Sequence, residues 1–130
     1  MSLLCLNYLV KECNEQFMMM KRSGQEKQDF FVAISSINLT SYMMSYLYMN
    51  QGTNMPTSHY RVRAGRPQFK TFCDLNAQSK SAFFVLHSLA FIHMFTLWRK
   101  LADANTGKLP PNFNKVIDET VDALHRVMSG

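Results

Sequence analysis

Apolar residues recur at the spacing of an α-helix from the first residues of the chain. The residues on the apolar side are Leu3, Leu6, Leu9, Val10, Cys13, Phe17 and Met20. Polar residues, among them Lys11 and Glu15, share the opposite side. This one-sided pattern predicts an amphipathic helix over about residues 2–21. Lys21-Arg22-Ser23-Gly24 is expected to end it, since cations and glycine favour helix C-termini.

The next predicted helix is apolar around its whole circumference. Ser23-x-x-Glu26 matches a capping box, and the pattern continues to about Asn50. From Phe30 onward apolar residues occupy all sides, with Ser, Thr and Asn between them and no charge from Asp29 to Arg61. Such a helix is buried on several sides or lies in a membrane.

Two further helices are predicted in the second half of the chain. The third begins at Pro67 or Asp74 and continues to about Ala104, with an uncharged middle from Ser81 to Trp98. The run Asn-Thr-Gly-Lys-Leu-Pro-Pro after it is a strong helix breaker. The fourth helix, about Pro111 to Met128, is again one-sided.

These elements predict one all-α domain over residues 1–130, a helical bundle of four principal helices whose central two are strongly apolar. A length of 130 residues suits a single domain. The central helices are each long enough to span a bilayer. Against a membrane protein stand their many Ser, Thr and Asn residues, the two one-sided helices, and a mean hydropathy of −0.14. We therefore expect no membrane partner and a homodimer that buries the excess apolar surface.

The cysteines and the N-terminal sequence predict a cytoplasmic protein. The cysteines Cys5, Cys13 and Cys73 are odd in number and form no CxxC motif. This pattern predicts buried free thiols in a reducing compartment. The opening MSLLCLNYLV has no basic segment before its apolar residues, which is unlike a signal peptide.

The positive charge is concentrated in one segment. The net charge is +5, and the stretch from His59 to Lys80 supplies +4 of it. Residues 51–67 form a loop with two glycines and two prolines that leads into this segment. The candidate nucleic-acid-binding residues are Tyr60, Arg61, Arg63, Arg66, Phe69 and Lys70. The cations would meet phosphates and the two rings would stack on bases of DNA or RNA. The alternative is a solvated loop whose arginines pair with carboxylates of neighbouring helices.

No catalytic or metal-ligating residues are predicted. The motifs HExxH, GxxxxGK[ST], GxGxxG and GxSxG are missing. His87 and His93 are six residues apart and do not share a helix face. Asp122-x-x-His125 has the spacing of a di-iron ligand pair, but no second such motif accompanies it. The chain is therefore expected to be non-enzymatic and to need no cofactor.

Two hypotheses of function follow from these observations. The first is a dimeric accessory or regulatory factor that binds nucleic acid through its basic loop. The second is a protein–protein interaction module with an apolar helical docking surface and no nucleic-acid role.

Overall fold

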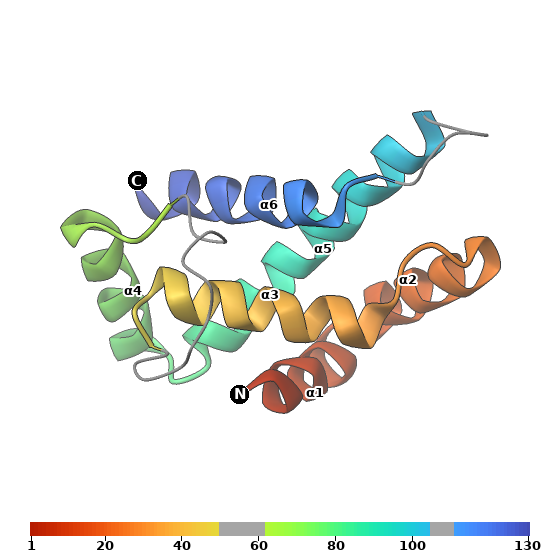
Figure 1. Ribbon diagram of the computed structural model, residues 1–130. Coiled ribbons are helices and arrows are strands. Elements are labelled where there is room, and N and C mark those ends of the chain that lie inside the picture. The colour runs from red at the N-terminus through yellow and green to blue at the C-terminus, as the bar shows by residue number, and fades with distance from the viewer. Residues whose placement is uncertain (50–61, 105–110) are drawn as a thin grey trace.

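The computed structural model describes residues 1–49, 62–104 and 111–130, and every regular element in them is an α-helix (Figure 1). The helices are α1 (Ser2–Glu12), α2 (Asn14–Lys27), α3 (Val32–Tyr46), α4 (Arg66–Gln78), α5 (Ala82–Ala104) and α6 (Phe113–Met128). The all-helical fold class is confirmed. The count of four principal helices is not, because the described residues form six.

The first predicted helix is divided into two. Cys13 leaves the helical conformation, with φ −124° and ψ 46°, and the chain resumes as α2 at Asn14. The predicted end at Gly24 is wrong, because α2 runs through it to Lys27. Its real end is Gln28, which adopts the left-handed conformation with φ 53°. The predicted capping box at Ser23 therefore lies inside a helix.

The second and third predicted helices also differ from the observed ones. The second is shorter than expected, since α3 begins only at Val32. The third is broken at Ser79, whose backbone is extended with φ −150° and ψ 124°. The fourth matches α6 closely. The side chain of Asn112 caps α6 by accepting a hydrogen bond from the Lys115 backbone N–H at 3.3 Å.

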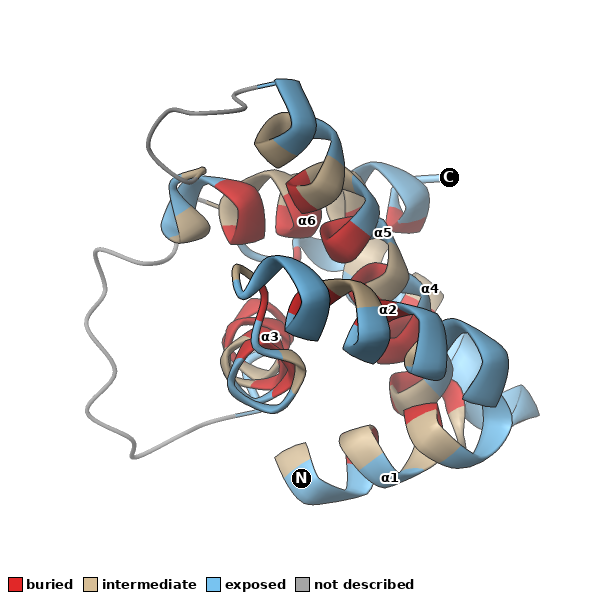
Figure 2. Cartoon of the chain, turned by 90° about the vertical axis from the view of Figure 1, so that its right-hand side faces the viewer, coloured by how far each residue is buried: buried red, intermediate tan, exposed pale blue. Residues whose placement is uncertain are grey.

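The hydrophobic core is built around α5, which packs against α1, α3, α4 and α6. Its buried residues include Phe91, Met94 and Trp98. Figure 2 marks the buried positions of α3, α5 and α6 in red. Between α3 and α6, the Tyr46 hydroxyl lies 2.7 Å from Nδ1 of His125. Burial raises the pKa of Tyr46 to about 12.

The polar residues of the apolar helices are accommodated inside the fold. Ser36 Oγ of α3 lies 3.2 Å from Nε2 of His87 on α5, and both residues are fully buried. The Thr40 hydroxyl donates to the backbone oxygen of Ser36 at 2.8 Å. These bonds let an uncharged helix carry small polar side chains into a protein core.

Among the described helices, only α5 has the length and apolar character needed to cross a membrane. More than half of its most apolar stretch is buried against the rest of the fold. The helix α3 has 15 residues, fewer than the roughly 20 that span a bilayer.

The cysteines only partly follow the expectation of buried thiols. All three are free; Cys5 is buried, Cys13 is half-buried and Cys73 is exposed on α4.

Candidate functional site

The predicted nucleic-acid segment begins outside the described residues, where Tyr60 and Arg61 lie. Arg63 is described, and its guanidinium carbon is 5.6 Å from the centre of the Tyr48 ring. This is the geometry of a cation–π contact, so Arg63 packs on the protein's own aromatic side chain.

The other three predicted residues lie in the first turns of α4. Arg66, Phe69 and Lys70 line a hollow of about 380 Å³ together with Tyr48. The ammonium of Lys70 is 2.8 Å from a carboxylate oxygen of Asp74, and this bond raises the pKa of Lys70. The structure thus brings half of the predicted residues together and pairs one of their cations within α4.

A second candidate site lies at the corner between α2 and α3, residues 28–31. The guanidinium of Arg99 on α5 makes two hydrogen bonds of 2.9 Å to the carboxylate of Asp29. Both side chains are mostly buried, and the paired geometry fixes position and direction. The next residue, Phe30, is buried among the aromatic side chains of α5.

This anchoring directs two large apolar side chains outward. Phe31 is the extended residue that precedes α3, and Ile34 lies one turn along the same face. Their exposed fractions are 65% and 62%. We call these two side chains the ridge.

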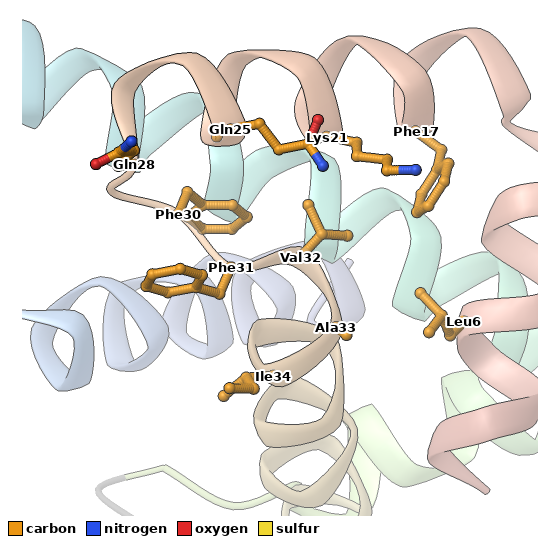
Figure 3. Close-up of a pocket in the computed structure, with 11 residues that line it drawn as sticks. Leu6, Phe17, Lys21, Gln25, Gln28, Phe30, Phe31, Val32, Ala33 and Ile34 are labelled. Carbon is orange, nitrogen blue, oxygen red and sulfur yellow. The ribbon is translucent and has the colours of Figure 1, made fainter.

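The ridge separates two concave surfaces, which share the lining residues Gln28, Phe30, Phe31 and Ile34. The large hollow has a volume of about 730 Å³ and lies between α1, α2 and the start of α3 (Figure 3). Its other lining residues are Leu6, Phe17, Lys21, Gly24, Gln25, Val32 and Ala33. The small hollow, of about 400 Å³, lies on the side of Asn38, Trp98 and Phe113.

Gly24 makes the close packing of this corner possible. A Cβ atom at position 24 would clash with the backbone oxygen of Phe30. Only glycine lets the α2 backbone approach the corner so closely.

Replacing Gly24 with alanine is expected to lower the free energy of unfolding by about 1–3 kcal/mol, because backbone must move to admit the methyl group. Without that contact, the same change inside a helix would stabilise it by roughly 1 kcal/mol. Urea unfolding followed by circular dichroism measures the difference. Ser23→Ala, one residue earlier on α2, is the control and should be neutral or slightly stabilising. A gain in stability for Gly24→Ala would show that the corner packs less tightly than described.

A sequence model of the ELMO/CED-12 family matches residues 1–117. The chain belongs to the ELMO/CED-12 family. No curated protein and no solved structure matches the chain at the level required for significance.

Membership of the ELMO/CED-12 family corrects the first hypothesis of function. The family is one of protein interaction and not of nucleic-acid binding, so the prediction of a DNA or RNA partner is wrong. The clustered charge around Arg63, Arg66 and Lys70 was misleading because charge alone does not identify a partner. In the structure, one of these cations packs on Tyr48 and another pairs with Asp74. The second hypothesis, a protein–protein interaction module, agrees with the family.

The expected homodimer gains no support either, since ELMO/CED-12 proteins interact with other protein partners. The expectation assumed that α3 and α5 stay exposed in one chain. Instead, α1, α4 and α6 cover much of α5, and α3 packs against α1, α5 and α6. The family is of the non-catalytic adaptor type. Among the described residues, no group of three His, Cys, Asp or Glu is placed to hold a metal ion.

The ridge was not singled out by the sequence pattern. Phe31 and Ile34 belong to a helix that is apolar all round, and the pattern gives no sign of which side faces water. The one available signal was Asp29, the last charge before a long uncharged run. Its pairing with Arg99, 70 residues away, became evident only in three dimensions.

Proposed function

We propose that this chain is a non-enzymatic protein-interaction module that docks a partner protein on the ridge and the small hollow beside it. The observation that carries the proposal is the exposure of Phe31 and Ile34 on an anchored corner of a chain from a protein-interaction family. Large apolar side chains flanked by hollows are typical of the energetic centre of an interface.

The proposed partner is a DOCK-type exchange factor for the GTPase Rac, the kind of protein with which ELMO/CED-12 proteins interact. Family members are cytosolic or recruited to membranes, and we propose a cytosolic location for this chain. Its three free cysteines support that location, because a reducing compartment preserves thiols.

The proposal is tested by placing a charge on the ridge. Phe31→Asp and Ile34→Asp should each weaken binding to a DOCK-type exchange factor by roughly 30-fold or more, as expected when a central interface residue loses 2 kcal/mol or more. Isothermal titration calorimetry gives the affinities. Both side chains are exposed, so the thermal unfolding of the free variants should change little.

Val127→Asp is the matched control. Val127 is an apolar residue of α6 with an exposed fraction of 71%, and it lines neither hollow. The same change there should leave the affinity unaltered. If Val127→Asp abolished binding while both ridge variants bound normally, the docking surface would lie on α6. Failure of the unaltered chain to bind would refute the proposed partner class.

A further inference from the structure

The large hollow differs from the rest of the candidate surface in its charge. Among the described residues that line it, the polar side chains are Lys21 and Gln25 of α2 and Gln28, which caps the end of α2. None of these described residues has a carboxylate. The hollow therefore combines an apolar floor with one cation and two amide groups.

We propose that the large hollow binds one free aliphatic carboxylate, with its hydrocarbon chain among the apolar side chains and its carboxylate against the ammonium of Lys21. This goes beyond the proposed function, because the ligand is a small amphiphile and not a protein. It does not depend on which partner occupies the ridge.

The size and walls of the hollow suit such a ligand. Its volume of about 730 Å³ falls within the range of roughly 300–1,000 Å³ that is common for small-molecule sites. Leu6 and Phe17 form one side, and Val32 with Ala33 forms the other (Figure 3). Sites of this kind are mostly apolar and use a few polar groups to orient the ligand.

The charge of the hollow selects an anion. The Lys21 side chain runs along the edge of the hollow toward Phe17 (Figure 3). Within the part of the chain that the structure describes, its ammonium forms no salt bridge. Asp29 lies in the sequence between the lining residues Gln28 and Phe30, but its carboxylate is held by Arg99. A single cation beside a large apolar surface fits a monoanion with a long hydrocarbon tail better than a polyanion.

One amide group adds a hydrogen-bond donor on the same side of the hollow as the cation. Gln25 extends from α2 toward the space above Val32 (Figure 3). Its NH₂ group can donate to a carboxylate oxygen, whereas Gln28 lies at the opposite end of the hollow from the Lys21 ammonium (Figure 3). The open side of the hollow leaves the carboxylate in contact with water, so no charge is buried on binding.

The test is calorimetric titration of the full 130-residue chain with octanoate, decanoate and dodecanoate below their micelle concentrations. Affinity should rise by up to about fourfold for each added methylene, the value for full burial of the group. Dodecanoate should bind roughly two- to fivefold more tightly than dodecanol, as expected for an exposed ion pair. Dodecylammonium should bind more weakly than either.

Variants at Lys21 separate this site from general detergent-like binding. Lys21→Gln should abolish the preference for dodecanoate over dodecanol, and Lys21→Glu should make dodecylammonium the better ligand. Arg22→Gln removes the same charge from the next residue, which does not line the hollow, and should leave the preference intact. Ala33→Phe should place an aromatic ring where the hydrocarbon chain would lie and weaken dodecanoate binding at least tenfold. Since Ala33 is exposed, this variant should fold normally.

Three results would overturn the proposal. One is a dodecanoate preference that falls equally in Lys21→Gln and Arg22→Gln. Another is that the protein sediments with phosphatidylcholine vesicles that contain dodecanoate, in a way that requires Lys21, but does not bind monomeric dodecanoate. The protein would then bind a membrane surface and not a single fatty acid. The third is absence of dodecanoate binding while Ala33→Phe weakens the exchange factor, which would make a partner side chain the occupant. The ridge variants test the proposed function without any fatty acid, so the two proposals can fail separately.

Discussion

Replacing Phe30 with alanine is expected to lower the free energy of unfolding by about 3–5 kcal/mol, the usual cost of emptying a buried phenylalanine site. The side chain has an exposed fraction of only 4%. Its ring centre lies 5.9 Å from that of Phe91, 5.3 Å from Phe95 and 5.8 Å from Trp98. These contacts attach the corner to α5, so the cavity would lie directly beneath the ridge. Urea unfolding followed by far-ultraviolet circular dichroism gives the value.

The neighbouring residue provides the control for this prediction. Phe31→Ala removes the same atoms from a side chain that is 65% exposed. Its effect on unfolding should stay within about 0.5 kcal/mol, as for most surface substitutions. Equal losses for the two variants would contradict the division of the corner into a buried anchor and an exposed ridge.

Acidification is expected to destabilise the protein through His87. Burial lowers the pKa of this side chain to about 4 from its ordinary value of 6.5, and a hydrogen bond to Ser36 offsets part of the effect. Between these two values the unfolded chain binds a proton that the folded chain does not. The contribution of neutral His87 to the free energy of unfolding is therefore complete above pH 6.5 and is lost as the pH falls to 4. The difference between the two pKa values corresponds to about 3 kcal/mol.

Two glutamine variants isolate this contribution. His87→Gln should lose the His87 part of the pH dependence, seen as a flatter plot of unfolding free energy against pH from 7 to 4. His93→Gln changes an exposed histidine of the same helix and should follow the unaltered protein. Identical profiles for the two variants would show that folding does not lower the pKa of His87.

Periodicity predicted some helices well because their pattern is independent of the rest of the fold. The helix α6 has one apolar face and an Asn112 cap, and both are visible in the sequence. The breaks at Cys13 and Ser79 were missed because neither residue is a strong helix breaker. At Gly24 the error is the opposite one, because the sequence predicts a helix end where α2 continues. Its lack of a side chain serves contact with Phe30 inside a helix, and local sequence cannot show that.

The sequence predicts the type of candidate site, an apolar helical surface, but not the residues that form it. The alternative hypothesis predicts an apolar helical docking surface, and the ridge is the exposed apolar surface proposed for that role. Which apolar residues stay outside depends on how α1, α5 and α6 cover α3, and that depends on contacts between distant parts of the chain. Lys21 illustrates the same point. In the sequence it predicts the end of a helix, whereas the packing of α2 against α3 places it beside the large hollow.

The position of Trp98 has a practical consequence for optical measurements. It is the sole tryptophan of the chain, it is buried, and it lines the small hollow. Tryptophan fluorescence therefore comes from one known place, where the Trp98 ring centre lies 5.8 Å from that of Phe30, the residue before the ridge. A partner without tryptophan that covers the small hollow would change the wavelength or yield of that emission, with no label attached. The protein thus carries an intrinsic fluorophore where docking is proposed, and stopped-flow mixing could follow association in real time.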